Sequence, residues 1–272
     1  MTAPYAEVIG DPIGHSKSPA IHKFWLERLG LAGDYRAMRI AADDVGAYVS
    51  NRRTDPAWRG CNITIPHKIA IMDHVGDPGK VRDTIGAMNT VLRDPSGELT
   101  GTNTDPGGFF APIAELPLNG KPVAVIGTGG AAHAVLFALS RVGVGPVTLI
   151  ARNPLKGAAM LARFGLRGNV QALSGPLPPV VLLVQATQLG MAGQPPLELD
   201  LSPLPDEAVV YDLVYAPVVT RLLAAAAARR LETVDGLEML IGQAALAFEL
   251  FFGAEPPRDD DVDDELRMLL MS

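Results

Sequence analysis

Short apolar runs alternate with amphipathic stretches along the chain, a pattern that predicts alternating strands and helices. The first part predicts strands at residues 6–9, 35–40 and 61–65, helices from residue 18 onward, at 43–53 and at 67–75, and a hairpin of residues 88–93 and 99–102. Asp94-Pro95-Ser96-Gly97 is a strong turn sequence inside that hairpin. At the start of the first helix, we place Ser18 at the N-cap and Pro19 in the first turn.

From about residue 106 the pattern changes to regular strand–helix alternation. It predicts a linking helix at 107–116, strands at 123–126, 147–151, 180–186 and 209–214, and helices at 134–142, 154–164 and 220–230. Such spacing is typical of βαβ units and a parallel sheet. Residues 237–252 form a long apolar helix that must pack against another element, and the acidic run 259–265 is expected to begin a solvated helix.

Length and composition narrow the class of protein. A chain of 272 residues favours two domains, the second of which we place at about residues 106–236. A net charge of −7 argues against a nucleic-acid partner. The single cysteine, Cys61, excludes an internal disulfide framework, and no His or Cys spacing suggests a metal site. Without a signal peptide or a long apolar segment, we expect a cytoplasmic protein with no membrane contact.

A glycine-rich turn follows the strand at 123–126 and precedes a helix. The fingerprint is Gly127-x-Gly129-x-x-Ala132, and this context is typical of a dinucleotide site. Gly127 would permit the tight turn and Gly129 the close approach of a pyrophosphate to the helix N-terminus. The predicted cofactor loop comprises Gly127, Thr128, Gly129, Gly130 and Ala131.

The end of the next strand indicates which dinucleotide binds. Arg152 stands where an acidic residue would select NAD, and Lys156 adds a second positive charge. A guanidinium matches a 2′-phosphate in charge and shape, so the sequence favours NADP. Asn153 lies between these two residues, and we predict that it also contributes to cofactor binding.

Four polar loops of the first part stand at strand ends, where α/β proteins bind ligands. They span residues 10–19, 62–68, 86–90 and 101–105. Together with residues 127–131, 186–191, 211–217 and 236–245, these loops resemble the signature segments of the shikimate dehydrogenase family. The resemblance runs in the family's order from about residue 5 to residue 253.

This resemblance implies two α/β domains, a substrate domain of residues 1–105 plus 237–272 and a Rossmann-type NADP-binding domain of residues 106–236. The helix at 237–252 would return to the first domain. The implied reaction is the reversible NADPH-dependent reduction of 3-dehydroshikimate to shikimate, by a monomer or a homodimer. Lys68 and Asp105 match the catalytic pair, and Thr187, Leu213 and Gly236 fall in cofactor-side motifs.

The resemblance also implies a substrate site. Ser16 and Ser18 match the residues that hold the substrate carboxylate. The positions that match contacts to the rest of the substrate are Asn62, Thr64, Asn89, Tyr215 and Gln243. A polyol needs many hydrogen-bonding partners, so a cluster of amides and hydroxyls suits such a substrate.

Three departures from the family pattern and two rival functions remain. Thr128 stands where Ala is common in the glycine-rich loop, a change that we expect to be tolerated. Ala151 replaces an Asn that is common beside Arg152, which predicts weaker 2′-phosphate binding, and Glu238 replaces a Gly at the start of the last long helix. One rival is a dehydrogenase acting on quinate or aminoshikimate. The other is a ligand sensor that binds NADP without turnover, against which the presence of Lys68 and Asp105 argues.

Overall fold

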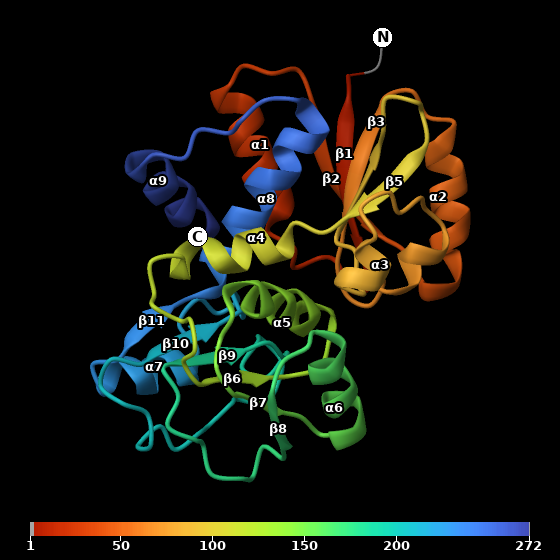
Figure 1. Cartoon of the computed structure of the whole chain (residues 1–272). Helices are drawn as coiled ribbons and strands as arrows, with labels where there is room; N and C mark the ends of the chain where they lie inside the picture. Colours follow the sequence, from red (N-terminus) through yellow and green to blue (C-terminus); the bar gives the residue numbers. More distant parts are fainter. Residues whose placement is uncertain (1–2, 272) are drawn as a thin grey trace. The chain divides into compact units, whose positions relative to one another are not determined.

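The computed structural model describes residues 3–271, and these form two compact units (Figure 1). One unit runs as far as Thr104 and resumes at Ile241, and the other is Asp105–Leu240. The intervening unit is therefore inserted into the first one, and each is described separately.

The first unit is built on a five-stranded sheet in the order β2-β1-β3-β4-β5. Its strands are β1 (Tyr5–Gly10), β2 (Asp34–Arg39), β3 (Trp58–Ile63), β4 (Thr90–Arg93) and β5 (Leu99–Thr102). β1 pairs in parallel with β2 and β3, whereas β4 is antiparallel to β3 and β5. The predicted hairpin is thereby confirmed.

Helices cover both faces of this sheet. They are α1 (Ser18–Arg28), α2 (Val45–Arg53), α3 (Val81–Thr84), α8 (Gly236–Phe252) and α9 (Asp260–Met271), with 3-10 turns at Ala42–Asp44 and Ala70–Asp73. On one face, Ala6 and Val8 of β1 pack against Ala247 and Phe251 of α8. The return of the apolar helix to the first unit, which the sequence led us to expect, is confirmed.

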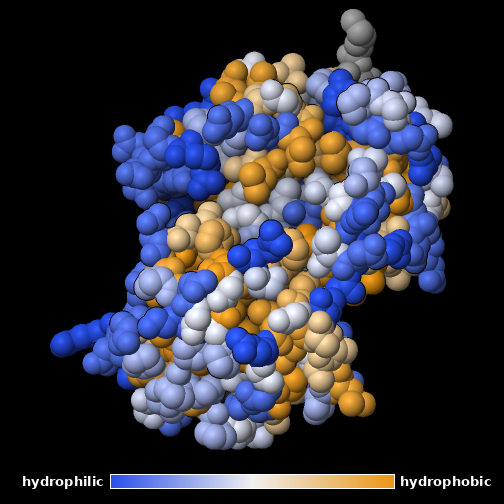
Figure 2. Space-filling model, in the orientation of Figure 1, coloured by the Kyte–Doolittle hydropathy of each residue, from blue (hydrophilic) through white to orange (hydrophobic). Residues whose placement is uncertain are grey.

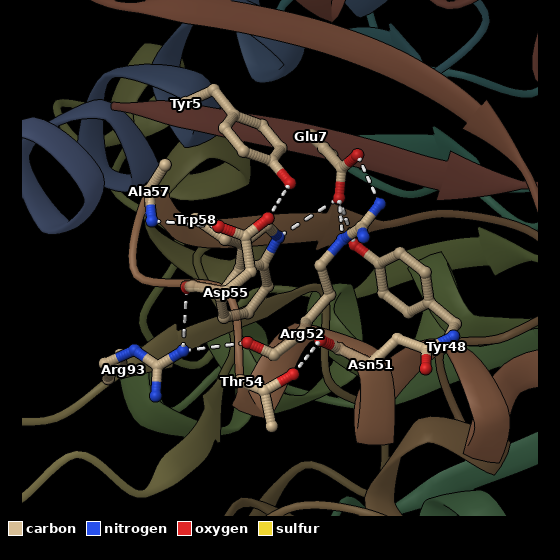
Figure 3. A network of polar contacts seen from close by, with 10 residues as sticks. All are labelled: Tyr5, Glu7, Tyr48, Asn51, Arg52, Thr54, Asp55, Ala57, Trp58 and Arg93. Atoms are coloured by element: carbon tan, nitrogen blue, oxygen red, sulfur yellow. Dashed lines mark hydrogen bonds and ion pairs between the residues drawn. The ribbon is translucent and has the colours of Figure 1, made fainter. Parts of the chain in front are cut away.

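The opposite face of β1 meets α2 through a buried polar network (Figure 3). Glu7 is 1% exposed, and its carboxylate accepts hydrogen bonds from Arg52, from the Tyr48 hydroxyl at 2.7 Å and from Trp58 Nε1 at 3.1 Å. Cys61 lies buried near this network, and burial raises the pKa of its thiol to about 12. A thiol held neutral in this way is a packing residue.

Outer helices of the first unit differ in surface character (Figure 2). The side of α9 seen there is hydrophilic, and its first turn carries Asp260, Asp261 and Asp263. The expected acidic helix start is confirmed, because the Asp259 carboxylate accepts the Val262 N–H at 3.0 Å. Apolar side chains gather over α8 in the same view.

The second unit contains a parallel six-stranded sheet in the order β11-β10-β9-β6-β7-β8. Its strands are β6 (Val123–Ile126), β7 (Val147–Ile150), β8 (Gly168–Gln171), β9 (Leu182–Gln185), β10 (Val209–Asp212) and β11 (Glu232–Val234). The chain order reverses between β6 and β9. That switch point is where doubly wound sheets bind ligands.

Helices flank this second sheet on both sides. They are α4 (Asp105–Phe110), followed by a 3-10 turn at Ala111–Ile113, then α5 (Gly130–Val142), α6 (Pro154–Arg163) and α7 (Arg221–Ala228). Leu136 of α5 and Met160 of α6 share one apolar core with β6, whereas Leu222 of α7 lies in the core of the other face. The predicted α/β class with a Rossmann-type unit is confirmed.

Candidate functional site

Two serines lie at the start of α1, where β1 gives way to the first helix. Ser18 is the first helical residue and is buried, and its N–H donates to Ser16 Oγ at 3.4 Å. The N-cap is Lys17, so our placement of Ser18 there was wrong. The reason is that the Lys17 carbonyl already accepts the Ile21 N–H, the first helical bond. Both hydroxyls stand beside a helix N-terminus, which favours an anionic ligand.

Lys68 lies in a turn that follows β3. The predicted helix at 67–75 is wrong, because this segment forms turns and only the 3-10 helix Ala70–Asp73. The Lys68 carbonyl accepts the Met88 N–H at 2.8 Å, while the Met72 N–H bonds Ile69 instead. A tertiary bond thus replaces the helical one and ties the Lys68 backbone to the loop before β4. Thr64, earlier in the same turn, is half-buried, and its carbonyl accepts the His67 N–H.

Three of the expected substrate-side amides belong to one buried network. Asn89 Nδ2 donates to Gln243 Oε1 at 3.2 Å and to Thr104 Oγ1 at 2.9 Å. Asn62 Nδ2 donates to Thr90 Oγ1 at 3.0 Å, and the Thr90 hydroxyl donates to Asn89 Oδ1 at 2.8 Å. The first unit therefore brings Asn62, Asn89 and Gln243 together, although 154 residues separate the last two.

Sequence reasoning missed three members of this network. Thr90 and Thr104 supply the linking hydroxyls, and Tyr35 donates to Asn62 Oδ1 at 2.6 Å. Thr90 directly follows Asn89, and Thr104 directly precedes Asp105. This position next to a candidate site residue was the only sequence signal that could have identified the two threonines. Nothing in the sequence singles out Tyr35, which sits in β2 and reads as an ordinary core aromatic residue.

Asp105 stands where the chain passes from the first unit to the second. It is the first residue of α4 and is 3% exposed. Thr104, immediately before it, is fixed by its N–H bond to Asn89 Oδ1 at 2.8 Å. The backbone that leads into Asp105 is thereby tied to the amide network.

In the second unit, the β6–α5 turn has the backbone that the fingerprint predicts. Gly127 has φ +118°, and a Cβ there would lie 2.8 Å from the Ala186 carbonyl oxygen. Gly129 is the N-cap of α5, and a Cβ on it would meet nothing within 4 Å. Thr128, Gly130 and Ala131 are half-buried around it. The open space at Gly129 and the N-terminus of a 13-residue helix fit a pyrophosphate.

The loop after β7 holds the expected positive charges. Arg152 and Lys156 are exposed, and Asn153 is the N-cap of α6, accepting the Lys156 N–H at 3.1 Å. β7 lies beside β6, and the Gly127 N–H donates to the Ile150 carbonyl. The two loops therefore share one edge of the sheet, so the donor set suits a phosphorylated dinucleotide.

Thr187, Leu213 and Gly236 follow the strands on the other side of the switch point. Thr187 follows β9, and its N–H and hydroxyl both bond Gln185 Oε1 at 3.0 Å. A Cβ on Gly236 would lie 2.5 Å from the Leu213 carbonyl oxygen, so Gly236 lets the start of α8 approach the loop after β10. These contacts bring Leu213 and Gly236 together.

A buried carboxylate anchors the loop that carries Tyr215. Asp212 is fully buried and accepts the Thr220 hydroxyl at 2.7 Å and the Val214 N–H at 3.0 Å. Burial, opposed by these two bonds, raises the pKa of Asp212 to about 6. Tyr215 is half-buried in the anchored loop, and desolvation raises the pKa of its hydroxyl.

Within residues 3–271, no group of three or more His, Cys, Asp or Glu side chains is placed to hold a metal ion. No helix of that described range has the length and apolarity needed to cross a membrane.

Comparisons with known proteins identify the family. The model of the shikimate dehydrogenase substrate binding domain matches residues 8–91, and that of the shikimate 5'-dehydrogenase C-terminal domain matches residues 236–260. The shikimate dehydrogenase (NADP(+)) of Sphingopyxis alaskensis is 65% identical over 270 residues, covering 99% of this chain and 98% of that protein. The chain belongs to the shikimate dehydrogenase family.

Solved structures agree with membership of the shikimate dehydrogenase family. Shikimate 5-dehydrogenase from Thermus thermophilus, in complex with NADP(H) and shikimate, has a TM-score of 0.86 at 37% identity and covers 98% of this chain and 99% of its own. Quinate dehydrogenase from Corynebacterium glutamicum, in complex with NAD, has the same TM-score at 29% identity and covers 99% of both chains.

Proposed function

We propose that this chain is a shikimate dehydrogenase, catalysing the reversible NADPH-dependent reduction of 3-dehydroshikimate to shikimate. The observation that carries this proposal is the 65% identity, over 99% of the chain, to a protein named shikimate dehydrogenase (NADP(+)). The presence of Lys68 and Asp105 at the family's catalytic positions supports turnover over a sensor role.

The two catalytic candidates would manage the proton of the reaction. Bound NADPH supplies the hydride, and the carbonyl oxygen that becomes the alcohol must gain one proton. In this proposal, the Lys68 ammonium stabilises the charge that develops on that oxygen and donates the proton. Asp105 accepts a hydrogen bond from the neighbouring substrate hydroxyl and orients the ring.

The first unit would provide the substrate site. Ser16 and Ser18 would hold the carboxylate at the start of α1, where the helix N-terminus adds a favourable field. The ring hydroxyls would be contacted by Asn62, Thr64, Asn89 and Gln243. Tyr215 is assigned to the substrate side as well. The division into a substrate domain of residues 1–105 plus 237–272 and a cofactor domain of residues 106–236 is part of this proposal.

The second unit would bind NADP. Its pyrophosphate would lie against residues 127–131, and its 2′-phosphate against Arg152 and Lys156, with Asn153 shaping that loop. Thr187, Leu213 and Gly236 would line the nicotinamide side, because they follow the strands across the switch point. We further propose a cytoplasmic protein that is a monomer or a homodimer.

The first experiment measures NADP reduction with shikimate, beside quinate with NAD. We expect turnover with shikimate and NADP, and a loss of roughly a hundredfold or more in kcat for Lys68→Ala. Lys121→Ala, an exposed lysine of the second unit, is the matched control and should behave as wild type. Turnover confined to quinate and NAD would favour the quinate dehydrogenase alternative, whose structural counterpart is similar in fold. Binding of NADPH without turnover would favour the sensor.

Cofactor choice is tested at Arg152. Arg152→Ala should raise KM for NADP by roughly ten- to a hundredfold and leave KM for NAD unchanged, since only NADP carries the 2′-phosphate. Arg141→Ala removes an exposed arginine from the other end of α5 and serves as control. Equal changes for both cofactors would contradict the assignment of Arg152 to the 2′-phosphate.

A further inference from the structure

A run of hydrogen bonds connects a core tyrosine of β2 to the proposed substrate amides. It begins at the Tyr35 hydroxyl, which is 2.6 Å from Asn62 Oδ1, and continues through Thr90 to Asn89 Oδ1. From Asn89 Nδ2 it reaches Gln243 Oε1. All of these residues belong to the first unit.

The direction of every bond in this run is fixed by a single backbone group. The Thr104 N–H can only donate, and it lies 2.8 Å from the Asn89 side chain, so the atom facing it must be Oδ1. The Thr90 hydroxyl contacts the same Oδ1 and therefore donates to it. Thr90 Oγ1 is then the acceptor for Asn62, which must turn its Nδ2 toward Thr90.

A second backbone group supports the same orientation of Asn62. The Asn89 carbonyl can only accept, and it lies 3.4 Å from Asn62 Nδ2. Both hydrogens of this amide are therefore engaged within the protein, and Oδ1 faces Tyr35. Asn62 can accept from a ligand but has no hydrogen left to donate. Tyr35 is the donor at the head of the run.

Burial makes the Tyr35 hydroxyl hard to replace. Tyr35 and Thr90 are 0% exposed and Asn62 is 6% exposed, so water does not substitute readily for a lost partner. The tyrosine ring is also held in place, because the His22 ring stacks on it with centroids 4.0 Å apart and planes 4° apart. Desolvation raises the pKa of the Tyr35 hydroxyl well above its ordinary value, which keeps it a donor.

We propose that Tyr35 is a positioning residue, which acts through Asn62 and Thr90 to orient the Asn89 and Gln243 amides toward the substrate. This proposal rests on the proposed function, because it assigns those amides to shikimate. It predicts that the Tyr35 hydroxyl controls the affinity for shikimate without contacting the ligand. This hydroxyl lies on the face of the sheet opposite α2.

The test compares two Tyr→Phe variants of the first unit, Tyr35 in β2 and Tyr48 in α2. Tyr35→Phe should raise KM for shikimate about tenfold, the loss expected from one buried hydrogen bond, and leave KM for NADP unchanged. Tyr48→Phe removes another buried hydroxyl, which donates to Glu7 on the opposite face, and it should leave both KM values unchanged. Thermal unfolding measures the stability that each variant loses, so that an effect on KM can be distinguished from a general loss of stability.

A double-mutant cycle then tests the route. Tyr35→Phe added to Asn62→Ala should raise KM for shikimate no further, since the group through which Tyr35 acts is already gone. Thr90→Val, which breaks the next link, replaces Asn62→Ala in the cycle if the alanine variant does not fold. A wild-type KM in Tyr35→Phe, or fully additive effects, would overturn the proposal. A wild-type protein without shikimate turnover would instead overturn the proposed function.

Discussion

Arg52 places its guanidinium against both carboxylate oxygens of Glu7, with Nε 2.8 Å from Oε2 and Nη2 2.9 Å from Oε1. The Glu7 side chain is 1% exposed and that of Arg52 18%. The pair joins the centre of β1 to the last turn of α2, and Glu7 Oε2 also accepts hydrogen bonds from the Tyr48 hydroxyl and the Trp58 indole (Figure 3).

Breaking this pair should destabilise the first unit. In Glu7→Gln, an amide N–H₂ faces the guanidinium and the positive charge loses its partner, so we expect the free energy of unfolding to fall by about 3 kcal/mol. Urea denaturation measures this change. Glu98→Gln, which breaks the exposed pair with Arg53, is the control and should cost less than about 1 kcal/mol. Equal losses would show that the buried network contributes no more than a surface pair.

The two glycines of the β6–α5 turn should respond differently to the same added methyl group. Gly127→Ala forces a residue with φ +118° and a Cβ 2.8 Å from the Ala186 oxygen, so it should lower both thermal stability and NADPH affinity. Gly129→Ala has room in the folded protein and should keep its stability. It should still weaken NADPH binding, because the methyl group occupies the space assigned to the pyrophosphate.

Calorimetry with NADPH and thermal unfolding together separate these outcomes. If Gly129→Ala binds NADPH as tightly as wild type, the pyrophosphate does not approach the backbone at that residue. If Gly127→Ala is as stable as wild type, the turn relaxes without cost.

Strands with a continuous buried apolar run were predictable, whereas the two polar edge strands of the second sheet were not. The strand at 123–126 was predicted with the bounds of β6, because four consecutive buried apolar residues carry a clear signal. β8 and β11 were missed, because their residues, Gly168–Gln171 and Glu232–Val234, are mostly polar and partly exposed. These two strands form because they pair with β7 and β10, and this pairing between distant segments leaves no signal in the local sequence.

Candidate ligand residues were predictable from motifs, whereas the partners that orient them were not. Asn89 and Gln243 stand in recognisable segments, but the bond between them depends on α8 returning to the first unit. Tyr35 stands between Asp34 and Arg36, and neither neighbour separates it from other core tyrosines. Only the fold shows that its hydroxyl reaches Asn62.

Asp212 should make stability depend on pH in an unusual direction. Its pKa of about 6 in the folded protein exceeds the ordinary 3.8, so the folded state holds the proton more tightly than the unfolded state. The contribution of this proton is full below about pH 4 and is lost as the pH rises through about 6, a change of about 3 kcal/mol. The stability of wild type relative to Asp212→Asn should therefore fall across this range.

Urea unfolding at half-unit pH steps measures that difference. Asp200→Asn is the control, because Asp200 is exposed and hydrogen bonds to Ser202 lower the pKa of its carboxyl. A wild-type stability that runs parallel to that of Asp212→Asn between pH 4 and 6 would contradict the raised pKa of Asp212.

His22 should make stability depend on pH in the opposite direction to Asp212. Complete burial lowers its pKa from 6.5 to about 3, so the unfolded chain binds the proton more tightly. Stability should fall as the pH drops from about 6.5 toward 3, by up to about 1.4 kcal/mol for each pH unit. Within the described residues, neither ring nitrogen of His22 has a hydrogen-bond partner, so His22→Phe should also keep the stack on Tyr35 without a buried polar cost.

The pH profile of His22→Phe is compared with that of His74→Gln, an exposed histidine of the same unit. We expect His22→Phe to remove the acid-dependent loss and His74→Gln to retain it. A retained loss in His22→Phe would place the acid sensitivity elsewhere.

The insertion of the second unit at Thr104 and Ile241 also orders events during synthesis. A nascent chain that has not reached Ile241 contains all five strands of the first sheet, yet Ala6 and Val8 lack the Ala247 and Phe251 side chains that cover them. The dinucleotide unit is contiguous, so it can fold while the sheet made earlier still exposes an apolar face. On the ribosome, the second domain to be translated is therefore the first that can be completed, and the first domain waits for the last long helix.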